Sequence, residues 1–183
     1  MNSTQLLRAI GVVAAATLGA TQLANAQNTT DPSSSDKKFV RAALAGENAE
    51  VDLGKLAVQK GSSDDVKEFG RKMVDDHTKL GEEMRTVADT EGIRAPAGST
   101  AKEKALAAKL ESLSGETFDK AYIAAMVKDH RGDLAAFKRE ASAGNDTAIK
   151  EEASQSTKVI EQHLQLAEEM ARNHKVPVEQ SGQ

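Results

Sequence analysis

Four long stretches of the sequence carry apolar residues at intervals of three and four positions. The second stretch shows the pattern clearly, with Val66, Phe69, Met73, Leu80 and Met84 in one series. This spacing places the side chains on one face of an α-helix, and such a face is buried when helices pack together. No stretch alternates apolar and polar residues, and alanine, lysine and glutamate, which favour helices, are abundant. The sequence therefore predicts an all-α protein with four long amphipathic helices.

Glycine, proline and capping residues indicate where these helices begin and end. The three prolines of the chain all lie outside the periodic stretches. We expect helices over residues 36–61, 62–92, 114–144 and 145–173, with a short helix around 100–112. Asp36 is expected to cap the first helix. The predicted fold is an antiparallel four-helix bundle with one extra short helix.

The first residues of the chain have the features of a secretory signal peptide. Arg8 supplies a positive charge, residues 9–20 form a short apolar run, and Ala24-Asn25-Ala26 fits a cleavage site. The apolar run is too short to cross a membrane, so we expect a periplasmic or secreted protein without a transmembrane segment in the mature chain. The predicted organisation is a signal peptide at 1–26, a disordered linker at 27–35, a helical bundle domain at 36–174 and a flexible tail at 175–183.

The composition excludes several classes of function. The chain has no cysteine, which excludes disulfides and thiolate catalysis and suits an oxidising compartment. Removal of residues 1–26 takes away one charged residue, Arg8, and leaves 23 basic against 28 acidic residues, a net charge of −5. An acidic chain with few aromatic residues is not typical of nucleic-acid-binding proteins, so no nucleic-acid partner is expected. No phosphate-binding glycine loop and no G-x-S-x-G motif occurs in the sequence.

Two of the four histidines lie at the same place in a repeated segment. The pattern H-x-x-L-x-E-E-M occurs at residues 77–84 and again at 163–170, 86 positions later. His77 and His163 both fall on the apolar faces of their helices. The two halves of the chain therefore look like related helical hairpins.

The remaining long helices also place a polar residue on the apolar face. His130 does so in the fourth helix. The first helix has no histidine, but Glu50 lies on its apolar face and Glu47 lies one turn earlier. His174, near the end of the last helix, is expected to be exposed to solvent. Each long helix thus contributes one group that is able to bind a metal.

Two interpretations of these side chains remain open. In the first, they meet inside the bundle and bind a transition-metal ion, namely zinc, copper or iron. The candidate ligands are Glu47, Glu50, His77, His130 and His163. A shared site predicts ring nitrogens roughly 3–5 Å apart. In the second, each histidine is a core residue with its own hydrogen-bond partner, and the repeat records duplication of a hairpin alone.

Counting along the helices tests whether these groups lie at one level. In an antiparallel hairpin, Glu47 and His77 are nearly level with each other, because they are almost equally far from the first turn. His130 and His163 are at unequal distances from the second turn, which predicts an offset of about 7 Å along the helix axis. This offset is the weakest point of the shared-site interpretation.

Several segments of the sequence resemble a known bacterial exported family. They are ENAEVDLGKLAVQK (47–60), VKEFGRKMVDDH (66–77), FDKAYIAAMVKDH (118–130) and EQHLQLAEEM (161–170). The family is the domain of unknown function 4142 family, which is grouped with ferritin-like bundles. The resemblance implies a ferritin-like four-helix fold and a periplasmic or outer-membrane-associated location, and it brings no established activity. One departure is Lys158, where the family often has a proline.

The positions that match the family's polar residues are Glu50, Asp76 with His77, Asp129 with His130, and His163. Asp76 and Asp129 each directly precede a histidine, so they point about 100° away around the helix. We expect them to be surface charges or partners of a neighbouring helix rather than ligands.

The ligand types narrow the choice of site. A ferritin-like di-iron centre uses E-x-x-H motifs, and no histidine here has a carboxylate three residues before it. A mononuclear zinc, copper or iron site fits better. Met73 and Met126 lie four residues before His77 and His130, and thioether with imidazole suits Cu(I), although methionine is also a common core residue.

The sequence therefore predicts an exported helical bundle of unassigned activity that binds a metal ion between its helices through histidine and glutamate. The alternative is a non-catalytic envelope or stress-related protein that acts through its helical surface and binds no metal. Whether the chain is an enzyme stays open at this stage.

Overall fold

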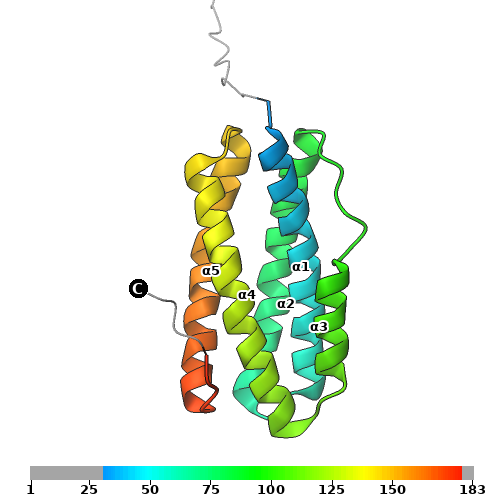
Figure 1. Ribbon diagram of the computed structural model, residues 1–183, viewed down its shortest axis with the longest axis vertical. Coiled ribbons are helices and arrows are strands. Elements are labelled where there is room, and N and C mark those ends of the chain that lie inside the picture. Colours follow the sequence, from blue (N-terminus) through cyan, green and yellow to red (C-terminus); the bar gives the residue numbers. More distant parts are fainter. Residues whose placement is uncertain (1–30, 179–183) are drawn as a thin grey trace, which may run out of the picture.

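The computed structural model describes residues 31–178, which form five α-helices and no β-strand (Figure 1). The helices are α1 (Ser34–Lys60), α2 (Asp64–Thr90), α3 (Ala101–Glu111), α4 (Gly115–Ala143) and α5 (Thr147–Asn173). The all-α prediction is confirmed, as are the four long helices and the short one between them. The expected signal peptide at 1–26 lies outside the described residues.

The long helices form two antiparallel hairpins, α1 with α2 and α4 with α5, which pack together through α1–α4 and α2–α5 contacts. After α2 the chain returns along the outside of the bundle, and α3 packs against α1 and α4 on the way (Figure 1). Neighbouring long helices are therefore antiparallel, and one long connection joins the hairpins. This is the connectivity of ferritin-like bundles.

The N-cap of α1 lies three residues before the predicted one. Ser33, and not Asp36, is the N-cap: its side chain accepts a hydrogen bond from the backbone N–H of Asp36. The Asp36 carboxylate in turn accepts from the backbone N–H of Ser33, which completes a capping box. The last two residues of the expected linker, Ser34 and Ser35, are consequently helical.

Two buried aspartates tie each hairpin to the turn of the other. The Asp36 carboxylate accepts hydrogen bonds from the backbone N–H groups of residues 145–146, each at 3.1 Å. The Asp119 carboxylate, near the start of α4, accepts from residues 62–63 at 2.9 and 3.0 Å. Asp119 lies 83 positions after Asp36, and the turn at 145–146 lies 83 positions after the turn at 62–63. This reciprocal clamp fixes the two hairpins relative to each other.

The core consists of two apolar clusters with a polar layer between them. One cluster includes Leu53, Met73 and Met126, and the other includes Leu44 and Phe137. On each long helix, the candidate metal ligands lie between the residues of one cluster and those of the other. The polar layer therefore crosses the middle of the bundle.

The two glycines inside α1 play different roles, although both suggest a close helix contact in the sequence. A Cβ added at Gly54 would lie 2.8 Å from the carbonyl oxygen of Gly70, so α1 and α2 touch through their backbones there. A Cβ added at Gly46 would meet nothing within 4 Å. A close helix contact therefore accounts for the glycine at position 54 and not for the one at position 46.

The residues after α5 are anchored to the bundle as far as they are described. Val176 is buried, and Val178 packs against the first apolar cluster. Nε2 of His174 lies 2.8 Å from the carboxylate of Asp65, and its side chain is 18 % exposed, so the expectation of a solvated residue is wrong. Val176 and Val178 are thus packed within the segment where a flexible tail was expected, and 179–183 lie outside the described residues. None of the described helices is long and apolar enough to cross a membrane.

Candidate metal centre

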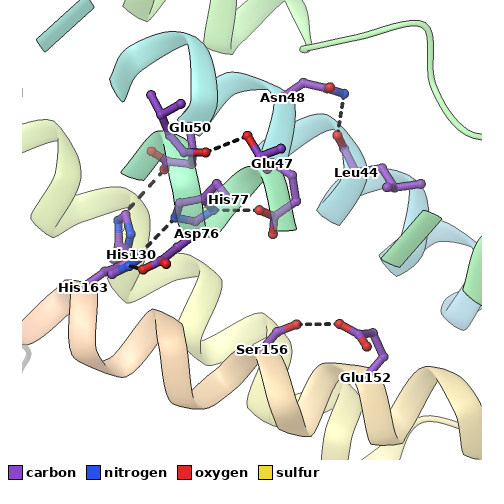
Figure 2. A network of polar contacts seen from close by, with 12 residues as sticks. Leu44, Glu47, Asn48, Glu50, Asp76, His77, His130, Glu152, Ser156 and His163 are labelled. Atoms are coloured by element: carbon purple, nitrogen blue, oxygen red, sulfur yellow. Dashed lines mark hydrogen bonds and ion pairs between the residues drawn. The ribbon is translucent and has the colours of Figure 1, made fainter. Parts of the chain in front are cut away.

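Three histidines from three helices meet in the polar layer (Figure 2). His77 on α2, His130 on α4 and His163 on α5 are at most 3 % exposed. Their ring centroids are 5.0 Å apart for His77 and His163, 5.5 Å for His130 and His163, and 5.6 Å for His77 and His130. One ring nitrogen from each histidine lies within 4.8 Å of the other two. The offset expected between α4 and α5 therefore does not keep the rings apart.

Each histidine has one ring nitrogen held by a hydrogen bond on the outer side of the cluster. Nδ1 of His77 donates to the Glu47 carboxylate at 2.7 Å. Nε2 of His163 donates to the Asp76 carboxylate at 2.7 Å (Figure 2). Nδ1 of His130 donates to the backbone carbonyl of Met126 at 3.0 Å. These bonds set the tautomer and the orientation of all three rings.

The other three ring nitrogens face one another. Nε2 of His77 lies 3.1 Å from Nδ1 of His163. Nε2 of His130 is buried and has no hydrogen-bond partner among residues 31–178. A metal-bound histidine typically donates its second N–H to a carboxylate or a carbonyl, which is the pattern found at each of these rings. The arrangement therefore has both the inner nitrogens and the outer hydrogen bonds of a three-histidine metal site.

The rings differ in charge because they repel one another and contact different carboxylates. Burial opposes protonation of His77, but the hydrogen bond and charge of Glu47 outweigh it and raise the pKa. Burial and then the charge of His77 lower the pKa of His163 to about 4 and the pKa of His130 well below its ordinary value. The neutral His163 ring carries its hydrogen on Nε2, where it bonds to Asp76, so its Nδ1 accepts the hydrogen bond that Nε2 of His77 donates. His130 and His163 are neutral, the form that binds a metal.

The two candidate glutamates have different surroundings. Glu47 is engaged by His77, so it orients that ring. Glu50 is 5 % exposed, and its Oε1 lies 4.0 Å from Nδ1 of His130. Its Oε2 has no hydrogen-bond partner in the described part of the chain. Burial raises the pKa of Glu50 to about 8, which reflects the cost of a desolvated carboxylate.

Asp76 and Asp129 each directly precede a histidine of the cluster and have different surroundings. Oδ2 of Asp76 accepts from His163 and also from the Lys72 ammonium at 2.8 Å. Burial opposes ionisation of Asp76, but these two donors outweigh it and lower the pKa. Asp76 is thus a partner of a neighbouring helix. Asp129 is half-buried, and burial raises its pKa.

Two further groups near the centre were not among the candidate ligands. Asp133 lies one turn after His130, and burial followed by the charge of Asp129 raises its pKa to about 7. Its spacing from His130 is the signal that could have identified it.

The Tyr122 hydroxyl is buried without a hydrogen-bond partner within residues 31–178, and burial and the charge of Glu50 raise its pKa well above the ordinary value. Nothing in the sequence marks Tyr122 as different from a core aromatic residue.

Solved structures with low sequence identity share this fold. A DUF305 fragment from Deinococcus radiodurans has a TM-score of 0.69 at 14% identity, with coverage of 78% of this chain and 99% of that chain. A DUF305 protein from Streptomyces coelicolor has a TM-score of 0.66 at 15% identity, covering 80% and 98%. CopM in its Cu(I)-bound form has a TM-score of 0.63 at 14% identity, covering 75% and 96%. At these identities the similarity establishes the fold alone.

The sequence comparison addresses the family. No curated protein matches the chain. The sequence matches the domain of unknown function DUF4142 over residues 21–170, which include all of the candidate metal ligands. The resemblance found in the sequence segments is thereby confirmed, and the chain belongs to the DUF4142 family.

Proposed function

We propose that this protein binds a transition-metal ion between its helices through His77, His130 and His163. The observation that carries the proposal is the set of inner ring nitrogens, each backed by a hydrogen bond at the outer nitrogen of the same ring. Burying a polar atom without a partner is costly, and Nε2 of His130 is such an atom among the described residues. An ion in this space would satisfy it.

The donor set favours a mononuclear site for copper, zinc or iron. Three imidazoles suit all three metals, with metal–nitrogen distances of about 2.0–2.1 Å for zinc. Copper is the first candidate, because CopM, which shares the fold, was solved with Cu(I). Glu50, with a free carboxylate oxygen, is the candidate for a fourth ligand. The burial of the rings suits retention of an ion rather than turnover of a substrate.

Metal titration of protein purified without a histidine tag tests this proposal. The parent should bind one Cu⁺, Cu²⁺ or Zn²⁺ ion per chain, and His77→Ala, His130→Ala and His163→Ala should each weaken binding at least about 100-fold, since each removes a ligand. His174→Ala is the matched control, because His174 lies outside the cluster and bonds to Asp65. Equal binding by parent and cluster variants, or no binding, would instead favour a structural envelope protein without a metal.

We also propose that the protein is exported to the periplasm or secreted, because residues 1–26 have the features of a signal peptide. Intact mass of the protein recovered from the cell envelope should correspond to a chain that begins at Gln27. A mass that retains residues 9–20 would indicate an anchored protein.

A further inference from the structure

Two pockets of the bundle adjoin each other and lead to the metal centre. The outer pocket lies between α1, α3 and α4 and has a volume of about 410 Å³. The inner pocket, of about 180 Å³, lies between the long helices and is lined by His77. Four residues line both pockets, namely Gly46, Glu50, Glu103 and Asp133. The two pockets share this lining and together extend from the α3 face of the molecule to His77, and we refer to them as the passage.

The groups along this passage can accept a cation through carboxyl oxygens. The inner pocket is lined by Glu50, Glu103 and Asp133 and by Glu47, which His77 already engages, and by no lysine or arginine among the described residues. The lining of the outer pocket adds one further acidic residue, Asp129, and two basic residues, Lys102 and Lys128. Clefts lined by one sign of charge concentrate ions of the opposite sign and speed their association.

A third and larger pocket, of about 570 Å³, also reaches His77 but has a less favourable lining. It lies between α1, α2 and the connection after α2. Its three acidic residues are balanced by Lys55, Arg85 and Lys104. One of those acidic residues is Glu47, whose carboxylate is already engaged by His77. A cation is therefore attracted less strongly from this side.

Glu50 is the group in the passage that most clearly lacks a partner. It is 5 % exposed and lines both pockets, and its Oε2 has no hydrogen-bond partner within residues 31–178. A carboxylate desolvated in this way is stabilised by a cation that passes beside it. Asp133, which also lines both pockets, lies on the opposite helix α4.

We propose that the two adjoining pockets are the access route for the metal ion, with Asp133 and Glu50 as the carboxylates that receive a hydrated cation before it reaches the histidines. The inference rests on the proposed function of the three histidines. It gives Asp133 on α4, and Glu50 on α1 in addition to its place as candidate fourth ligand, a role in how fast the ion is gained and lost.

Gly46 provides a way to narrow the passage without removing a ligand. It lines both pockets, and a Cβ at this position would meet nothing within 4 Å. In Gly46→Leu, the new side chain would extend into the passage. A change that only obstructs a route alters the rates of association and dissociation by the same factor, so the equilibrium affinity stays the same.

Stopped-flow mixing of the full chain with Cu²⁺ measures these rates. Tyr122 is the one tyrosine of the chain, and the chain has no tryptophan, so quenching of its fluorescence reports arrival of the ion at the nearby centre. Gly46→Leu should slow both uptake and chelator-driven release about tenfold, with unchanged Kd. At about pH 8, Asp133→Asn should slow uptake about three- to tenfold and should weaken the dependence of the uptake rate on salt, because a steering charge has been removed.

Ala97→Leu is the matched control, since it adds the same kind of bulk to the third pocket. It should take up Cu²⁺ at the parent rate. Parent-like rates in both Gly46→Leu and Asp133→Asn would overturn the access route, as would slow uptake in Ala97→Leu alone. If Gly46→Leu does not fold by circular dichroism, the salt dependence in Asp133→Asn decides the question. A parent that binds no metal at equilibrium would contradict the proposed function instead, so the two failures are distinguishable.

Discussion

The Asp76 carboxylate accepts a hydrogen bond from Nε2 of His163 across the α2–α5 contact, at 2.7 Å. This bond places the hydrogen of the His163 ring on the outer nitrogen, so that Nδ1 presents its lone pair to the interior. Lys72 donates to the same carboxylate oxygen and keeps it ionised. The direction of the His163 lone pair is therefore set by Asp76, which is not itself one of the candidate metal ligands.

Replacing Asp76 by asparagine should weaken metal binding about 10- to 100-fold, the effect typical of removing a carboxylate that orients a histidine ligand. The amide is similar in shape but carries no charge, so His163 loses its preference for the productive tautomer. Competition with a chelator of known affinity measures the change. Asp75→Asn, on the exposed side of the same turn, is the control and should bind like the parent. Equal affinities of parent and Asp76→Asn would show that the hydrogen bond has no such role.

Replacing His130 by leucine should stabilise the metal-free protein while abolishing tight metal binding. Leucine is close to histidine in volume and removes a buried ring nitrogen that has no partner among the described residues. Such an atom costs about 1–3 kcal/mol, so we expect a gain of about 1 kcal/mol in the free energy of unfolding. Urea denaturation in the presence of a chelator measures it. A decrease of more than about 1 kcal/mol in the free energy of unfolding would instead mean that His130 stabilises the core of the metal-free protein.

Alanine substitutions at the two glycines of α1 should have opposite effects on stability. Gly46→Ala should stabilise the protein by about 0.5–1 kcal/mol, because the site is open and alanine favours a helix. Gly54→Ala should destabilise it by about 1–3 kcal/mol, because the added carbon meets the Gly70 carbonyl oxygen at 2.8 Å. Thermal melts of the two variants provide the comparison. A gain in stability for both would show that α1 and α2 separate easily at Gly54.

Glu140 should make stability depend on pH at the end of the bundle where Asp36 clamps the α4–α5 turn. Burial and then the hydrogen bond with Asp36 raise the pKa of Glu140 from 4.5 to about 7. The protonated form is favoured in the folded state, so this contribution is fully present below about pH 4.5 and is lost as the pH rises through about 7.

Glu140→Gln keeps the hydrogen bond and cannot ionise, so it should stabilise the protein at pH 8 by about 1–2 kcal/mol and have little effect at pH 4.5. Urea denaturation at the two pH values measures the difference between variant and parent. Glu151→Gln, an exposed change on α5, should leave the pH dependence unchanged. An identical pH dependence in parent and Glu140→Gln would contradict the role given to Glu140.

The helices could be predicted from the sequence because the apolar spacing, the helix-favouring residues and the residues at the helix ends all indicate them. The position of individual residues along the axis of the bundle could not be predicted in this way. The repeated H-x-x-L-x-E-E-M segments are 86 positions apart, whereas the turns and their clamping aspartates are 83 apart. The difference of three residues is nearly one helical turn, so the second copy is shifted along its helix. Leu80 and Leu166 match in the repeat, but Leu80 is 4 % exposed while Leu166 is 38 % exposed. Residues that match in the repeated segments therefore do not occupy equivalent positions in the structure.

The meeting of the histidines could be predicted from the helix faces, but the roles of the glutamates could not. Glu47 and Glu50 lie one turn apart and both are buried, so spacing does not distinguish them. Their difference arises from contacts with other helices, because His77 engages Glu47 and leaves Glu50 with a free oxygen. The position of His174 beside Asp65 likewise depends on where α5 ends relative to α2.

The reciprocal clamp of Asp36 and Asp119 has a consequence for how the two halves depend on each other. Either hairpin alone would leave the N–H groups of its turn without a carboxylate, so each half depends on the other for these hydrogen bonds. His77 belongs to the first hairpin, and His130 and His163 belong to the second. An ion bound by all three histidines would therefore link the two hairpins, and the hairpins of the metal-bound protein would separate only if the bonds to the ion were broken.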